Sequence, residues 1–200
     1  MITSKMILNY VHTDRSVRAR DESLIACAIS TVFFVIFAGS CQSHWVKTRP
    51  TPGTWIANES ATVCISVSNE TLPSVIDAVR AWDKAIGTWR RMMPVVGINE
   101  LCNYVIRETK PGPEVPDTVL ASTRVKGEEV KLYVGRYEVD PLGVTLHEIG
   151  HLLGAGHIEG TLMSPYVNYG AYRCPDAATI AQVAMANAVD PSLFRWCNNR

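Results

Sequence analysis

Alternating and helically spaced apolar positions divide residues 61–189 into strands and helices. The segment ATVCISVS at residues 61–68 alternates and is rich in β-branched residues, which predicts a strand. Apolar residues that recur at spacings of three and four predict a helix over residues 72–92, ended by Pro94. The further elements that we predict are strands at residues 102–108, 119–125 and 129–134, and helices at 141–153 and 177–189. Strands and helices do not alternate regularly in this order, so we predict an α+β fold.

The amino-terminal region has a different pattern. Residues 24–38 form an apolar run of fifteen residues, LIACAISTVFFVIFA, preceded by several basic residues. This run is short for a membrane span, which needs about 20 residues, and it suits the core of an export signal, which has roughly 7–15. The small residues Ala38 to Cys41 resemble a bacterial lipobox, in which Cys41 would be lipidated. An ordinary cleaved signal and an uncleaved anchor are the alternatives.

Each of these alternatives places residues 42–200 outside the cytoplasm. We therefore expect residues 1–41 to be an export or lipoprotein signal, residues 42–54 a linker, and residues 55–200 one domain. The chain of 200 residues is 47% hydrophobic, which is enough to form a buried core. Nineteen basic and nineteen acidic side chains cancel, and this balance argues against a nucleic-acid partner. Membrane attachment would occur through the amino-terminal segment alone, and we expect a monomer.

Four cysteines lie outside the export segment, namely Cys64, Cys102, Cys174 and Cys197. An even number of cysteines in an exported domain predicts two disulfides. Of the three possible pairings we favour Cys64–Cys102 with Cys174–Cys197, because each pair then falls in one half of the domain. A thiolate zinc site is disfavoured because the chain has no C-x-x-C pair.

The segment HEIGHLLGAGH carries the candidate chemistry. His147 and His151 are four residues apart, so on a helix they project from one face and can reach the same metal ion. Gly154 can end the helix in the left-handed conformation, and the turn would bring His157 to that ion as a third ligand. Three nitrogen ligands with an open position are typical of catalytic zinc. Glu148 lies beside this face, where it can act on a water molecule at the metal.

This motif, H-E-x-x-H-x-x-G-x-x-H, resembles that of the metzincin metallopeptidases. Met163, in the segment GTLMSP at residues 160–165, stands where that family has a methionine turn beneath the metal. Leu-Met-x-Pro is most similar to the matrixin branch, and the resemblance covers roughly residues 54–189. It implies a zincin-like domain with a mixed twisted sheet, an active-site helix and a C-terminal helix, holding one catalytic Zn²⁺.

The resemblance also implies a mechanism and a substrate site. Glu148 would be the general base and acid that exchanges a proton with water and with the leaving nitrogen. Protein or peptide substrates would bind extended along an exposed sheet edge, with the backbones of Leu120 and Ala121 as contacts. Pro165 and Tyr166, which follow the methionine turn, would contribute to the substrate site.

Three hypotheses about function follow from these features. The first is a zinc endopeptidase that is secreted or anchored at the cell surface. The second is a zinc-bearing surface binding module without activity, and the third is a membrane-anchored structural protein. The histidine triad disfavours the third hypothesis. Glu148 disfavours the second, because inactive relatives commonly lose this glutamate.

Overall fold

The computed structural model describes residues 60–124, 128–166, 168 and 170–197. The predicted export segment with Cys41, the linker at residues 42–54 and the first five residues of the predicted domain lie outside this range. Among the described residues, none of the helices combines the length and apolar character that a membrane span requires.

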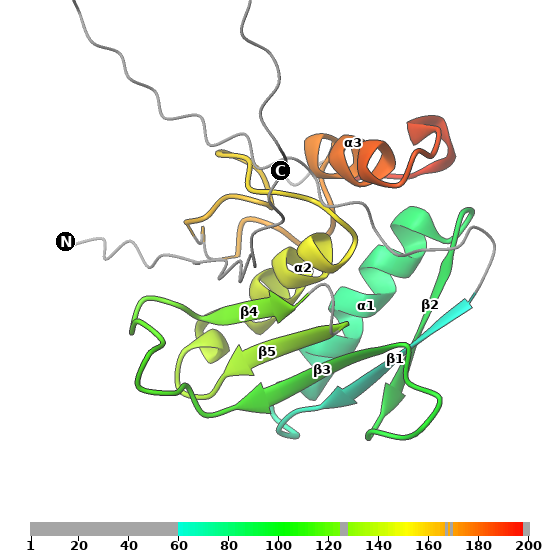
Figure 1. The fold of residues 1–200 in the computed structure, drawn as a ribbon. Helices are drawn as coiled ribbons and strands as arrows, with labels where there is room; N and C mark the ends of the chain where they lie inside the picture. Colours follow the sequence, from blue (N-terminus) through cyan, green and yellow to red (C-terminus); the bar gives the residue numbers. More distant parts are fainter. Residues whose placement is uncertain (1–59, 125–127, 167, 169, 198–200) are drawn as a thin grey trace, which may run out of the picture. The chain divides into compact units, whose positions relative to one another are not determined.

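A five-stranded mixed sheet forms the first layer of the fold (Figure 1). Its strands are β1 (Ser60–Ser66), β2 (Arg91–Val96), β3 (Tyr104–Thr109), β4 (Ala121–Arg124) and β5 (Glu129–Tyr133), arranged in the order β2-β1-β3-β5-β4. All neighbouring strands are parallel except β4, which runs antiparallel to β5 at one edge. The α+β class and the mixed sheet predicted from the sequence are therefore confirmed.

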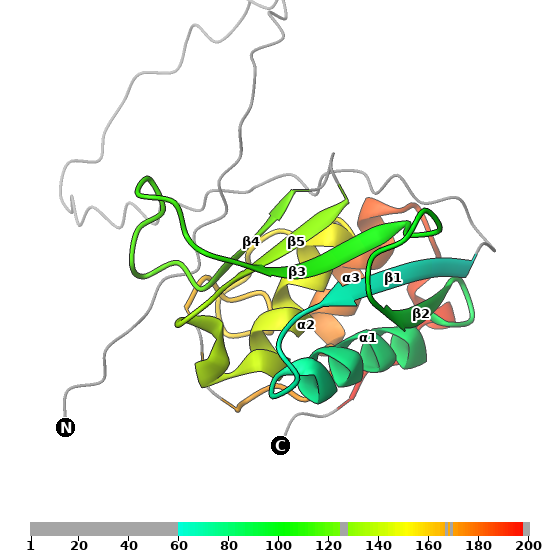
Figure 2. The same ribbon diagram turned by 90° about the horizontal axis from the view of Figure 1, so that it is seen from below.

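Two helices, α1 (Leu72–Ile86) and α2 (Pro141–Leu152), cover one face of this sheet (Figure 2). The indole Nε1 of Trp82, which is fully buried on α1, donates a hydrogen bond of 3.0 Å to the carbonyl of Leu146 on α2. Helix α3 (Ala177–Ala186) follows near the carboxyl end, and the 3-10 turns η2 (Tyr137–Val139) and η3 (Pro191–Leu193) complete the described elements. The hydrophobic core is formed between the sheet and these helices.

The prediction that the first helix extends to residue 92 is wrong. Helix α1 ends at Ile86, and Arg91–Val96 is instead the edge strand β2, which pairs in parallel with β1. Asp83 turns the chain at this point, because its carboxylate accepts the backbone N–H of Met92 at 2.7 Å and the guanidinium of Arg91 at 2.8 Å. Pro94 is tolerated in β2 because an edge strand can leave one N–H position unpaired.

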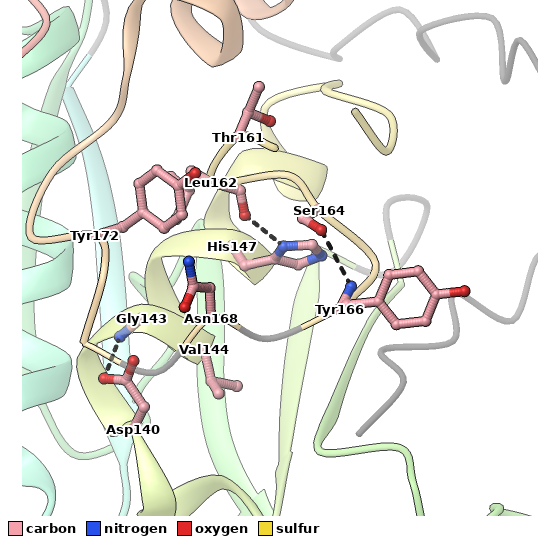
Figure 3. Close-up of a pocket in the computed structure, with 10 residues that line it drawn as sticks. All are labelled: Asp140, Gly143, Val144, His147, Thr161, Leu162, Ser164, Tyr166, Asn168 and Tyr172. Carbon is pink, nitrogen blue, oxygen red and sulfur yellow. Dashed lines mark hydrogen bonds between the residues drawn. The ribbon is translucent and has the colours of Figure 1, made fainter. Parts of the chain in front are cut away.

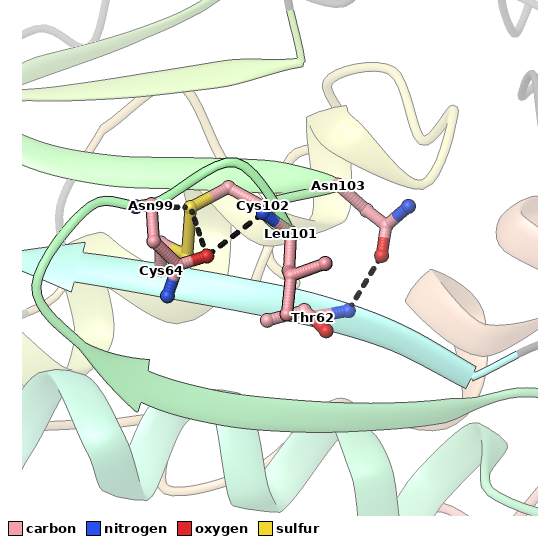
Figure 4. Close-up of a disulfide and its surroundings, with 6 residues drawn as sticks. All are labelled: Thr62, Cys64, Asn99, Leu101, Cys102 and Asn103. Atoms are coloured by element: carbon pink, nitrogen blue, oxygen red, sulfur yellow. Dashed lines mark hydrogen bonds between the residues drawn. A yellow bond between two sulfur atoms is a disulfide. The ribbon is translucent and has the colours of Figure 1, made fainter.

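Two disulfides brace the domain, and they are the pairs favoured from the sequence. Cys64 on β1 is joined to Cys102, in the loop before β3, with the Cα atoms 5.5 Å apart (Figure 4). Cys174, just before α3, is joined to Cys197, with the Cα atoms 6.1 Å apart. Disulfides persist in oxidising compartments, so the pairs agree with maturation outside the cytoplasm.

Candidate metal centre

Helix α2 presents His147 and His151 on one face, one turn apart, as the sequence predicts. The helix is fixed at its start by Asp140, whose carboxylate accepts the backbone N–H of Gly143 at 3.1 Å. Its opposite side is held in the core by side chains that are fully buried, namely Leu146, Ile149 and Leu153. The two histidines are themselves buried, at 2% and 5% exposure. The helix is thus anchored rigidly enough to position both rings.

The turn after α2 brings the third histidine to the same place. Gly154 has a φ of +93°, the left-handed conformation expected of a glycine that ends a helix. His157 consequently folds back towards the helix, with its ring centroid 5.3 Å from that of His147 and 4.7 Å from that of His151. The ligand atoms of the three histidines all lie within 4.8 Å of one another, so the cluster can hold a metal ion.

Main-chain carbonyls set the orientation of the two helical rings. His147 Nδ1 lies 2.8 Å from the carbonyl oxygen of Leu162, and His151 Nδ1 lies 2.8 Å from that of Ala155. Because a carbonyl only accepts, each Nδ1 carries the proton and each Nε2 presents a lone pair. His147 Nε2 is buried and has no hydrogen-bond partner among the described residues. An orphaned, correctly oriented lone pair is what a metal ligand requires.

The distances also suit coordination. His151 Nε2 and His157 Nε2 are 3.1 Å apart. Two nitrogen ligands at 2.0–2.1 Å on one tetrahedral ion are separated by about 3.3 Å, which is nearly the same distance. The residues present therefore fit a small ion with three nitrogen ligands and one position left open.

Burial keeps the three imidazoles neutral. It lowers the pKa of His147 to about 3, with a further contribution from neighbouring His157. It also lowers the pKa of His151 well below the usual value and, to a smaller degree, that of His157. Metal ligation requires the neutral form of histidine, so burial prepares the site across the physiological pH range.

Met163 packs against α2, the helix that carries His147 and His151. Its side chain is fully buried, and a Cβ placed on Gly150 would come within 2.4 Å of the Met163 sulfur. The glycine between the first two histidines is thus explained by close packing against Met163. This predicted methionine also belongs to a tight turn, because the N–H of Ser164 donates to the Thr161 carbonyl at 3.0 Å.

Helix α3 supports this turn from the other side. Asp176, the N-cap of α3, accepts the backbone N–H of Leu162 at 2.7 Å, and Leu162 is the residue whose carbonyl orients His147. Gln182 on α3 accepts the N–H of Gly156 at 3.0 Å. Sequence reasoning did not identify either residue, because their roles depend on how α3 docks. The acidic N-cap before residue 177 is the one signal in the sequence that could have suggested a role for Asp176.

Glu148 is buried next to the metal cluster without being part of it. Its side chain is 2% exposed, and its carboxylate does not belong to the group of convergent ligand atoms. Burial raises the pKa of Glu148 to about 7, although a hydrogen bond from Thr123 acts in the opposite direction. A carboxyl group with a pKa near neutrality can both accept and release a proton at physiological pH. Thr123 is a further residue that sequence reasoning missed.

The predicted substrate edge is present as β4, the last strand of the sheet. The carbonyl of Leu120 accepts the N–H of Tyr133, so it faces β5 and not the open edge. Hydrogen-bonded and non-hydrogen-bonded pairs alternate in an antiparallel ladder, and therefore the main-chain groups of Ala121 and Thr123 point away from β5. Leu120 and Ala121 are buried as whole residues, at 0% and 1% exposure, so their main-chain groups are covered as well as their side chains.

A pocket opens beside His147, between α2 and the segment that follows Met163 (Figure 3). It is partly open to solvent, and its lining combines polar and apolar residues. The lining residues are Asp140, Gly143, Val144, His147, Thr161, Leu162, Ser164, Tyr166, Asn168 and Tyr172. Tyr166 lines this pocket, whereas Pro165, Leu120 and Ala121 do not, and the substrate contacts expected of these four residues stay a prediction. A comparison with family models and with curated proteins finds no match to this sequence.

Proposed function

We propose that residues 55–200 form a zinc-dependent endopeptidase of the metzincin type, most similar to the matrixins. The observation that carries the proposal is the convergence of three neutral histidines beside a buried carboxylate. Structural zinc sites are closed by four protein ligands, whereas catalytic sites have three and leave one position for water or substrate. Among the described residues, the cluster at His147, His151 and His157 offers three ligands, which is the number that a catalytic site has. Its nitrogen donors and its tetrahedral spacing favour zinc.

His147, His151 and His157 would hold the zinc ion, which would polarise the scissile carbonyl and lower the pKa of water. The chain itself supplies the proton transfer. A carboxylate oxygen of Glu148 accepts a proton as water attacks, and the same carboxyl returns it to the leaving nitrogen. The carboxylate of Glu148 is buried, and its surroundings keep bulk water from competing. Glu148 also distinguishes this proposal from an inactive binding module.

The substrate that fits this site is an extended protein or peptide segment. Its backbone would pair with β4 on the side away from β5, to which the main-chain groups of Ala121 and Thr123 are directed. One side chain would enter the pocket beside His147, which lies next to the metal cluster. Tyr166, at 42% exposure, would form part of the pocket entrance.

The proposed site of action is outside the cytoplasm. The disulfides support this location. The apolar segment at residues 24–38 would direct export, and lipidation at Cys41 would attach the protein to a membrane. Production by export is therefore part of the test, because it allows both disulfides to form.

The experiment combines metal analysis with a search for cleavage. The full chain, produced by export, is purified and its metal content measured by mass spectrometry, together with His151→Ala. We expect about one zinc per wild-type chain and much less in the variant. The zinc-loaded protein is then incubated with a mixed peptide library, and the cleavage sites are read by mass spectrometry.

Each result has a defined meaning. A full equivalent of zinc in His151→Ala would refute the three-histidine site. Cleavage that is abolished by a chelator and restored by zinc would support the endopeptidase. A wild-type protein that holds zinc and cleaves no peptide would refute the enzymatic proposal and favour the binding module.

A further inference from the structure

Thr123 joins the edge strand to the carboxylate of Glu148. The threonine is on β4, and its side chain is buried against α2 at 6% exposure. Its Oγ1 lies 2.5 Å from Glu148 Oε2 and 3.0 Å from the backbone carbonyl oxygen of the same residue. The contact connects residues 25 positions apart in the sequence. It depends on the register of β4, which places residue 123 opposite Val130.

A hydroxyl group is well suited to this position. It has one proton to donate and two lone pairs with which to accept. Two acceptors of Glu148, the carboxylate Oε2 and the backbone carbonyl oxygen, are within reach. When the carboxylate is charged, the hydroxyl donates to Oε2. When Oε2 carries a proton, that proton can be donated to Oγ1 while the hydroxyl turns to the backbone carbonyl. The same threonine can thus hold the carboxyl group before and after it has taken up a proton.

The hydrogen bond also determines which carboxylate oxygen is available. Thr123 engages Oε2, and the described part of the chain provides no hydrogen bond to Oε1. A buried glutamate without this partner would have several rotamers and an oxygen without a hydrogen bond, which is unfavourable. The threonine thus selects one orientation of the carboxylate and leaves the other oxygen to act on water.

We propose that Thr123 is a positioning residue, which holds the carboxylate of Glu148 in its working orientation and links it to the bound substrate strand. This inference rests on the proposed endopeptidase function. Its second part follows from the ladder, in which the main-chain N–H and carbonyl of Thr123 point away from β5, on the side of β4 where a further strand would pair. A peptide that pairs with this edge would contact the residue that holds the proton-transfer group. Substrate backbone and general base are then positioned by one residue.

The test compares three variants of the full chain. Thr123→Val keeps the shape and the β-branch but removes the hydroxyl group, whereas Thr123→Ser keeps the hydroxyl group. Thr145→Val is the matched control, because Thr145 on α2 is equally buried and its hydroxyl has no partner among the described residues. Zinc content is measured for all three variants and is expected to equal that of the wild type.

Two readouts are used. The first is kcat and KM on a peptide that the wild type cleaves. Loss of a group that orients a catalytic residue typically costs 10–100-fold, so kcat of Thr123→Val should fall by about that factor with KM nearly unchanged. Thr123→Ser should recover most of kcat, and Thr145→Val should match the wild type. The second readout is the ¹³C signal of the Glu148 carboxyl group in metal-free protein, which should move in Thr123→Val alone.

These readouts separate the inference from the function on which it rests. A carboxyl signal that is the same in Thr123→Val and in the wild type would overturn the contact. A signal that moves while kcat stays at the wild-type value would overturn the positioning role. If the zinc-loaded wild type cleaves no peptide, the endopeptidase proposal fails, and the carboxyl signal alone then decides whether Thr123 holds Glu148.

Discussion

Gly150 offers a test of the packing that supports the metal centre. It lies on α2 between His147 and His151, and a Cβ at this position would meet the Met163 sulfur at 2.4 Å and its terminal methyl group at 3.1 Å. A flexible side chain could normally move away from such a contact. Met163 is fully buried, however, so its displacement must disturb neighbouring core residues. Gly150→Ala should therefore destabilise the protein, although alanine is the better helix former.

The size of the effect follows from two opposing contributions. Replacing glycine by alanine inside a helix gains about 1 kcal/mol of helix propensity. Forcing an additional methyl group into a packed core costs about 1–3 kcal/mol. We therefore expect a net loss of roughly 0–2 kcal/mol in the free energy of unfolding. Met163→Ala alone should cost about 2–5 kcal/mol, because it leaves a cavity.

The double variant separates these contributions. Removing the Met163 side chain makes room for the new methyl group, so Gly150→Ala in the Met163→Ala background should stabilise by about 1 kcal/mol. The assay is urea unfolding of metal-free protein, with the m-value checked for each variant. Ala181→Gly is the control, because at an exposed position of α3 this change measures the difference in helix propensity between alanine and glycine without a packing contribution. Equal effects of Gly150→Ala in both backgrounds would refute the proposed contact.

Three further predictions concern other parts of the domain. Glu148→Gln should keep zinc and lower peptide turnover by at least about 10²-fold, because glutamine cannot accept the proton; unchanged turnover with zinc bound would remove Glu148 from the mechanism. Replacing Cys64 and Cys102 together by serine should lower the free energy of unfolding in urea by about 2–4 kcal/mol, since the bridge spans 38 residues; an unaltered midpoint would contradict this. Burial alone would raise the pKa of Glu108, but hydrogen bonds from Tyr137, Ser68 and Thr71 lower it below the usual value. The charged form of Glu108 therefore stabilises the folded state, fully above the pKa of the unfolded state, and this contribution is lost as the pH falls through the pKa of the folded state. In Tyr137→Phe, the free energy of unfolding should decrease less between pH 7 and pH 3 than it does in the wild type. A pH profile identical to that of the wild type would argue against the role of this hydrogen bond.

The order of strands and helices was largely predictable because local periodicity determines it. The error at residues 87–92 has a local cause as well. Apolar residues such as Trp89 and Met92 fit the helical spacing and are also suitable in a strand. Asp83 favours the strand over the helix, because its carboxylate binds the chain after the turn. This contact joins polar groups across a bend, so it cannot be predicted from the pattern of hydrophobic residues.

The candidate site shows the same division between local and distant information. His147, His151 and His157 fall within eleven residues, so helical spacing and one glycine turn were enough to bring them together. Met163 was found only through the resemblance to a family. Thr123 and Asp176 were missed because their contacts depend on strand register and on the docking of α3. Those features are set by the folded core and not by neighbouring residues.

The use of main-chain carbonyls to orient His147 and His151 has a consequence for mutational tolerance. Every residue type carries a carbonyl, so no substitution at Ala155 or Leu162 deletes the oxygen that fixes either ring. The orientation can be lost only if the path of the backbone changes. Saturation mutagenesis should therefore find that these two positions accept other residues of suitable size, and that Gly154 and Gly160, with φ values of +93° and +75°, accept almost none. Natural variation can thus alter the surroundings of the centre while the geometry of its ligands is retained.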